Sequence, residues 1–138
     1  MLNSSQSAPT SDLAAVLTTL LVTDMTDEIS PIFRVADGRR AAAWYARLGF
    51  EVEGEHRFAA DLPLYLFLNR NGASLHLSEH TGDARPGALV YLSVDDVDAI
   101  AAEFGVKVET QPWAREVELA DPDGNRLRIG ERVVSAGS

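Results

Sequence analysis

One order of secondary-structure elements is predicted twice along this chain of 138 residues. Apolar and polar residues that alternate predict strands, whereas apolar residues three and four positions apart predict helices. By these criteria residues 30–80 contain a strand, a helix and three further strands, and residues 88–132 repeat that order. Two copies of about fifty residues are too few for a solenoid. We therefore predict an α+β fold in which two tandem βαβββ modules form a curved, incomplete mixed β-barrel.

The boundaries of the expected elements follow from the same patterns. In the first module we expect strands over residues 31–35, 50–58, 64–69 and 74–80, with a helix over residues 39–48. In the second module we expect strands over residues 88–94, 106–109, 115–120 and 126–131, with a helix over residues 96–104. Turn-forming dipeptides such as Asn71-Gly72 and Asp123-Gly124 separate strands in both modules. Residues 81–87 form the linker.

Residues 1–29 lie outside the repeat as an N-terminal extension, and residues 133–138 form a tail without a pattern. Apolar residues of the extension recur at helical spacing and follow a capping residue, Ser11 or Asp12: they are Leu13, Val16, Leu17, Leu20 and Leu21. This spacing predicts a short amphipathic helix. Its apolar stripe requires cover from the domain or from a second subunit, and docking on a partner protein is a further hypothesis.

Composition excludes several classes of function. The sequence has no apolar run of about 18 residues, so we expect no transmembrane helix. The net charge of −9 argues against binding to nucleic acid or to anionic membranes and favours a cationic or neutral ligand. Cysteine is absent, which rules out disulfides and thiolate metal sites and suits a cytoplasmic location.

Strand parity predicts which side chains share a face of each sheet. The residues expected to pack beneath the helices are Phe33, Val35, Leu75, Leu77, Val90, Leu92, Leu127 and Ile129. Those expected on the opposite, concave face are Ile32, Arg34, Ser74, His76, Ser78, Leu89, Tyr91, Ser93, Glu116, Glu118, Arg126 and Arg128. This mixed lining suits a ligand cavity. Alternatively, Glu118 and Arg128 pair across adjacent strands of an exposed face.

Several segments resemble a known superfamily. Residues 44–50 and 121–125 are similar to segments found throughout the vicinal oxygen chelate superfamily, which includes glyoxalase I, extradiol dioxygenases and bleomycin resistance proteins. Residues 55–58, 75–80 and 111–116 more closely resemble the bleomycin resistance branch. The resemblance covers roughly residues 30–132 and implies the fold already predicted from the repeat.

The resemblance also identifies the positions that hold a metal ion in the superfamily's enzymes. In this sequence they are Ser30, His76, Leu89 and Arg128. Metal ions of this class favour imidazole or carboxylate ligands, so His76 alone is suitable. A separate site could combine Glu79 with His56, His76 and His80, but strand residues four apart are separated by about 13 Å. We expect no metal or cofactor, and histidines that serve as hydrogen-bonding groups.

Trp113 is the residue most indicative of function, because a large ring in a loop is costly unless a ligand or partner covers it. In the bleomycin resistance branch this loop borders a ligand groove between two subunits. The ligand-binding residues that we expect are Trp113, His76, Glu116, Glu118, Tyr91, Arg128, His56, Phe58 and Phe67. A tryptophan that only seals the dimer interface is the alternative.

These expectations favour a non-catalytic homodimer that sequesters a small planar natural product, cationic or neutral, at a dimer interface. No catalytic residue is assigned. The alternative is a lyase or isomerase of the same superfamily, either dependent on a metal or metal-free with His76 as general base.

Overall fold

The computed structural model describes residues 27–133 and contains both predicted modules. The first module consists of β2 (Ile32–Arg34), α2 (Gly38–Arg47), β3 (Glu51–His56), β4 (Tyr65–Arg70) and β5 (Ala73–Ser78). The second consists of β6 (Leu89–Ser93), α3 (Val97–Phe104), β7 (Glu109–Thr110), β8 (Ala114–Ala120) and β9 (Arg126–Arg132). The predicted N-terminal helix and residues 134–138 lie outside the described residues.

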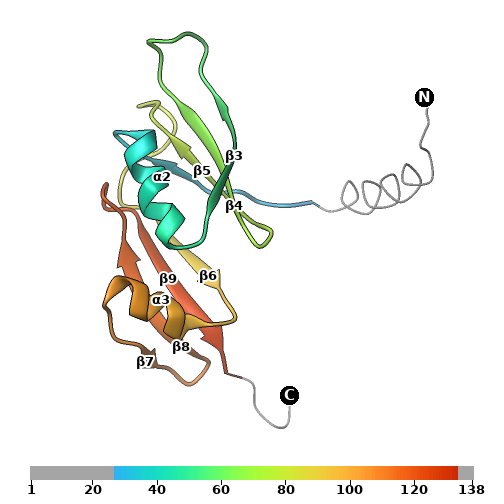
Figure 1. Ribbon diagram of the computed structural model, residues 1–138, viewed down its shortest axis with the longest axis vertical. Coiled ribbons are helices and arrows are strands. Elements are labelled where there is room, and N and C mark those ends of the chain that lie inside the picture. Colours follow the sequence, from blue (N-terminus) through green and yellow to red (C-terminus); the bar gives the residue numbers. More distant parts are fainter. Residues whose placement is uncertain (1–26, 134–138) are drawn as a thin grey trace, which may run out of the picture.

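The two sheets have the same topology. Their strand orders are β2-β5-β4-β3 and β6-β9-β8-β7, with the first and last strand of each module parallel and the other pairs antiparallel. Figure 1 shows the modules one above the other, each with its helix against its own sheet. The α+β fold of two βαβββ modules is therefore confirmed, and the described strands form two open sheets rather than a closed barrel.

Sequence accounts for the helix ends and for the core. Each helix begins after an aspartate whose side chain accepts a hydrogen bond from a backbone N–H of the first turn: Asp37 from Arg40 and Asp96 from Ala99. The predicted apolar face is correct, since all eight of its residues belong to the hydrophobic core or pack against it. No helix within residues 27–133 has the length and apolar character required to cross a membrane.

A buried polar network joins the two modules. The Tyr45 hydroxyl on α2 donates to Asp121 Oδ2 at 2.7 Å, and Asn125 Nδ2 donates to the Arg34 carbonyl at 3.0 Å. At the exposed edge of this network, the Ala36 N–H donates to Asp123 Oδ1 at 3.0 Å. Figure 1 shows the β8–β9 turn reaching the first module beside α2. The segment predicted only as a turn therefore also fixes the position of one module against the other.

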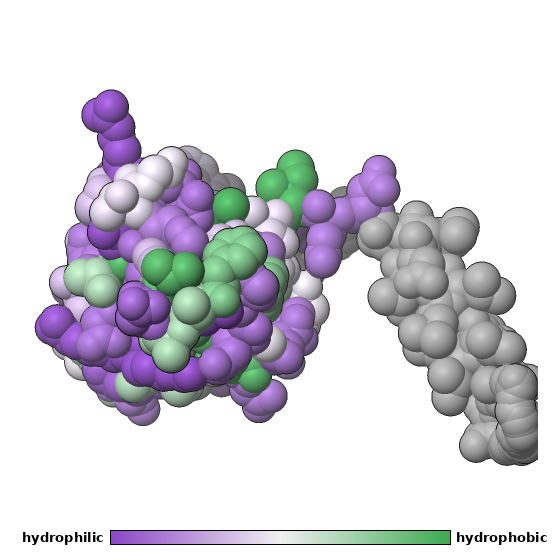
Figure 2. Space-filling model, turned by 90° about the horizontal axis from the view of Figure 1, so that it is seen from above, coloured by the Kyte–Doolittle hydropathy of each residue, from purple (hydrophilic) through white to green (hydrophobic). Residues whose placement is uncertain are grey.

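Three predicted strands differ from those observed by two residues or more at one end. The strand expected over residues 74–80 ends at Ser78. The strand expected over residues 50–58 ends at His56, so Phe58 lies in the β3–β4 connection with 75% of its surface exposed. Figure 2 views the molecule from the end that carries this connection and shows a small hydrophobic patch among hydrophilic residues. The strand expected over residues 106–109 is only Glu109–Thr110. The reason is that Gly105 ends α3 in the left-handed conformation and the Val106 N–H still bonds to Ala101.

Candidate functional site

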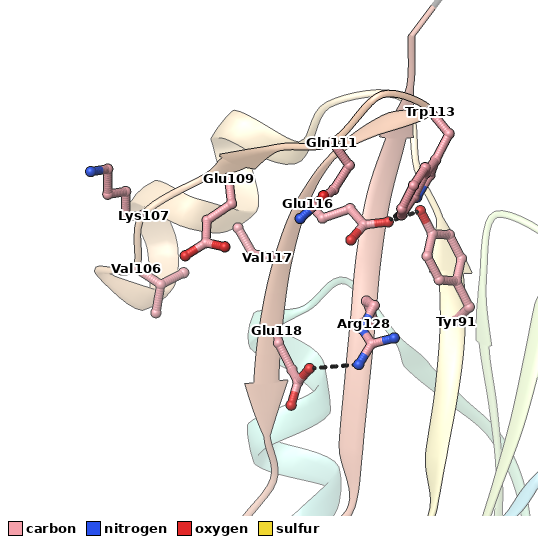
Figure 3. Close-up of a pocket in the computed structure, with 10 residues that line it drawn as sticks. All are labelled: Tyr91, Val106, Lys107, Glu109, Gln111, Trp113, Glu116, Val117, Glu118 and Arg128. Carbon is pink, nitrogen blue, oxygen red and sulfur yellow. Dashed lines mark hydrogen bonds and ion pairs between the residues drawn. The ribbon is translucent and has the colours of Figure 1, made fainter.

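A pocket of about 570 Å³ opens on the polar face of the second module. Figure 3 shows that its walls come from β6, β8, β9 and the segment that leads from α3 into β8. The lining residues are Tyr91, Val106, Lys107, Glu109, Gln111, Trp113, Glu116, Val117, Glu118 and Arg128. Five of the nine predicted ligand-binding residues therefore line one pocket.

Glu116 connects the two aromatic residues of this pocket. The Trp113 indole N–H and the Tyr91 hydroxyl both donate to the same oxygen, Glu116 Oε2, each at 2.8 Å. Figure 3 shows both bonds converging on that oxygen. Glu116 is only 7% exposed, whereas Trp113 remains 60% exposed. The tryptophan ring is thus fixed at its polar edge and open to a ligand elsewhere.

The register of the sheet explains why the Tyr91 hydroxyl can reach Glu116. Glu116 lies opposite Gly130 on β9, and Tyr91 pairs with Arg128 two residues earlier. A β-carbon on Gly130 would come within 2.0 Å of the Tyr91 hydroxyl oxygen, so only glycine leaves room for it. Desolvation and the bond to Glu116 raise the pKa of Tyr91, so the hydroxyl stays protonated and donates.

Glu118 has a different environment from Glu116, although both side chains lie on the same face of β8. It accepts hydrogen bonds from Arg126 at 3.1 Å and from Arg128 at 3.2 Å. These bonds lower the pKa of Glu118. The alternative of cross-strand pairing between Glu118 and Arg128 is therefore what the structure shows, although both residues also line the pocket.

The other four predicted ligand-binding residues lie in the first module. His76 lines a pocket of about 540 Å³, and its Nδ1 is 2.8 Å from the Tyr65 hydroxyl. His56 and Phe58 line a separate hollow of about 390 Å³, and Phe67 contributes to both. The predicted set is thus divided between the modules of one chain.

Sequence reasoning missed the other five lining residues of the second-module pocket. They are Gln111, Val117 and, in the chain that follows α3, Val106, Lys107 and Glu109. The alternation of apolar and polar residues places these last three in a regular strand, whereas only Glu109 lies in one. The signal that could have identified them was Gly105, because a left-handed helix end commonly directs the chain into an irregular segment.

The four superfamily metal positions do not fit a metal ion. Ser30 donates to the Ser74 hydroxyl at 2.7 Å, Leu89 has no ligand atom, and Arg128 is cationic and paired with Glu118. Ser30 and His76 line a pocket of the first module, whereas Arg128 lines that of the second.

The separate histidine site is not assembled either. Both oxygens of Glu79 accept backbone N–H groups, from Gly38 at 2.7 Å and from Leu64 at 3.0 Å. Within the described range, one group of three side chains has possible metal-ligating atoms within 4.8 Å of one another. It consists of Asp96, Asp98 and Glu131 and contains no histidine. These three already accept bonds from Ala99 N–H, Arg115 and Val97 N–H, respectively.

Comparison with known proteins decides the family. A family model described as "Glyoxalase superfamily protein" matches residues 16–136. The chain belongs to the glyoxalase superfamily. The match includes residues that precede the first module. No match was found among curated proteins.

Solved structures similar to this chain include proteins that bind antibiotics. TnmS3, an antibiotic-binding protein from Streptomyces sp. CB03234, is 25% identical with a TM-score of 0.65, over 78% of this chain and 98% of its own. A bleomycin-binding protein in complex with bleomycin is 25% identical with a TM-score of 0.61, over 78% of this chain and 100% of its own. The bleomycin resistance determinant of transposon Tn5 is 25% identical with a TM-score of 0.60, over 79% and 100%.

Proposed function

We propose that this protein is a non-catalytic binding protein of the bleomycin resistance type, which sequesters a small planar natural product, cationic or neutral. Antibiotic binding by the similar TnmS3 and bleomycin-binding proteins supports this class of ligand. The absence of cysteine supports a cytoplasmic location.

The observation that carries the proposal is the state of Trp113. Its ring lies at a pocket of about 570 Å³, large enough for a drug-sized ligand, and is 60% exposed while its N–H is bonded to Glu116. A large aromatic ring that is held in one orientation but left uncovered is suited to stacking on a planar ligand. Because the ring is already ordered, binding costs little further conformational entropy.

We propose that the complete groove forms in a homodimer. Four predicted ligand-binding residues of the first module line other pockets than the one beside Trp113; they are His56, Phe58, Phe67 and His76. Side chains on both open sheets remain exposed, including Ile32 at 39%, Leu89 at 42% and Tyr91 at 49%. A second copy that placed its first module over the Trp113 pocket would cover these surfaces and join the two sets of residues around one ligand.

Calorimetric titration with bleomycin and other planar antibiotics, followed by mass spectrometry of the recovered compound, tests this proposal. We expect saturable binding by at least one compound, its recovery unchanged, and about tenfold or greater weakening in Trp113→Ala. Equilibrium sedimentation of the same samples should show a dimer. A compound converted in many turnovers per subunit, or binding that Trp113→Ala leaves intact, would contradict the proposal.

One observation supports the alternative of a metal-free lyase or isomerase. The Tyr65 hydroxyl, 2.8 Å from His76 Nδ1, orients an imidazole that also lines a pocket. A general base is commonly held by a second group in this way. Turnover of a carbonyl substrate that disappears in His76→Gln but persists in Trp113→Ala would favour the enzyme.

A further inference from the structure

One oxygen of the nearly buried Glu116 carboxylate has no hydrogen-bond partner among residues 27–133. Both donors, Trp113 and Tyr91, bind Oε2, whereas Oε1 receives no bond. Oε1 is not fully enclosed, since no fully buried side-chain oxygen in this part of the chain lacks a partner. Figure 3 shows Oε1 directed into the pocket, away from both aromatic rings. A carboxylate on a residue that is only 7% exposed thus presents a single acceptor to the pocket.

The chemistry of tryptophan determines which kind of atom of residue 116 can face Trp113. An indole N–H can donate a hydrogen bond but cannot accept one. The atom of residue 116 that faces Trp113 must therefore be an oxygen, and the other terminal atom of the side chain faces the ligand. Gly130 maintains this orientation by leaving room for the Tyr91 hydroxyl, whose oxygen would lie 2.0 Å from any β-carbon there.

We infer that Glu116 Oε1 is the specificity-determining group of the pocket, and that it selects planar ligands bearing an N–H or O–H donor at the edge of the ring stacked on Trp113. This inference rests on the proposed function and deepens it. A ligand that covers this acceptor removes water from it. A ligand without a donor is therefore disfavoured, because its binding leaves the acceptor unpaired.

The other charged residues of the pocket do not offer an equivalent acceptor. Glu118 already accepts from Arg126 and Arg128, at 3.1 and 3.2 Å, and lies in a more exposed position. Lys107, on the irregular segment after α3, and Glu109, the first residue of β7, lie on the other side of the pocket from Tyr91, as Figure 3 shows. The five ionisable side chains of the lining, tyrosine aside, are Lys107, Glu109, Glu116, Glu118 and Arg128, which together carry a formal charge of only −1. Overall charge alone is thus a weak basis for selection.

Replacement of Glu116 by glutamine should reverse the preference rather than only weaken binding. Because the Trp113 N–H requires an acceptor, the amide oxygen of the Glu116→Gln side chain should occupy the position of Oε2. The amide NH₂ group would then take the place of Oε1, and the pocket would present a donor instead of an acceptor. Ligands with a carbonyl or sulfonate oxygen at the ring edge should gain affinity, and ligands with an amine should lose it.

Three planar tricyclic probes separate hydrogen bonding from charge. Proflavine is a cation with amino donors, 10-methylacridinium is a cation without an N–H, and anthraquinone-2-sulfonate has only acceptors. For wild-type protein we expect calorimetry to show proflavine bound about tenfold or more tightly than 10-methylacridinium. In Glu116→Gln we expect proflavine to lose about tenfold and anthraquinone-2-sulfonate to gain a similar factor. Glu118→Gln is the matched control and should change all three affinities without reversing their order.

Folding of the variant is checked independently through the indole N–H resonance of Trp113, assigned with Trp113→Phe. It should remain shifted by hydrogen bonding in Glu116→Gln and lose that shift in Glu116→Ala. Binding of the probes with the same order in wild type and Glu116→Gln would overturn the inference while leaving the proposed function intact. Equal affinity of wild type for proflavine and 10-methylacridinium would also overturn it. Failure of all three probes to bind would also overturn the inference. The proposed function would be contradicted only if bleomycin and the other planar antibiotics failed to bind as well.

Discussion

The Tyr91 hydroxyl occupies the space that a side chain at Gly130 would fill, 2.0 Å from the position of the missing β-carbon. Gly130→Ala should therefore displace the ring and break its bond to Glu116. We expect a loss of about 1–3 kcal/mol in the free energy of unfolding, as for other overpacked sites, measured by urea denaturation. Binding at the Trp113 pocket should weaken as well.

A double-mutant cycle provides the control for Gly130→Ala. If the cost arises from the clash, it should largely disappear in a Tyr91→Ala background, because the hydroxyl is no longer present. A cost of the same size in both backgrounds would mean that Gly130 acts through its backbone and not through Tyr91.

Tyr45 and Asp121 form a hydrogen bond between the modules in a buried environment. Burial, and secondarily Asp121, raises the pKa of Tyr45, which therefore remains a donor at all ordinary pH values. Tyr45→Phe should lower the free energy of unfolding by about 1–2 kcal/mol, measured by urea denaturation. Tyr65→Phe, which removes a half-buried hydroxyl within one module, is the control and should cost less. Equal costs would contradict the role of Tyr45 in joining the modules.

The ion pairs of Glu118 predict a small acid dependence. Hydrogen bonds from Arg126 and Arg128 lower the pKa of Glu118 in the folded protein, so the ionised form stabilises the fold. This contribution is complete above the ordinary carboxyl pKa and is lost as pH falls through the lowered pKa of the folded state. Because Glu118 is exposed, Glu118→Gln should cost only about 0.2–1 kcal/mol at neutral pH.

Urea denaturation of both proteins from neutral to acid pH measures this effect. The difference between wild type and Glu118→Gln should shrink at the acid end and at high salt. A difference that grows as pH falls would show that Glu118 is destabilising when charged, contrary to the pairing seen here.

Strand parity was enough to predict both modules and the division between core and polar face. It predicted the same environment for Glu116 and Glu118, because both alternate with apolar residues on one strand. Their environments differ through the strand opposite: Glu116 faces Gly130, which admits Tyr91, whereas Glu118 faces Arg128. That distinction depends on register between strands, which the pattern of a single strand does not contain.

Other parts of the site depend on features with weaker signals in the sequence. The sequence pattern extends a strand to Phe58, two residues beyond its observed end, and places Lys107 in a strand where the chain is irregular. That the predicted ligand residues of the two modules line separate pockets could not be read from the sequence either. The repeat predicts two similar sheets but does not indicate which faces lie together.

Fluorescence titration of Trp44→Phe tests the central claim most directly, because Trp113 is then the only tryptophan. Trp44 is partly buried against Tyr45 and Phe104, away from the pocket lining, so its replacement by another aromatic residue should leave the pocket unaltered. We predict saturable quenching or a spectral shift of Trp113 by bleomycin or by one of the planar probes. A Trp113 signal unchanged by every planar compound, up to their solubility limits, would contradict a ligand-stacking role for this residue.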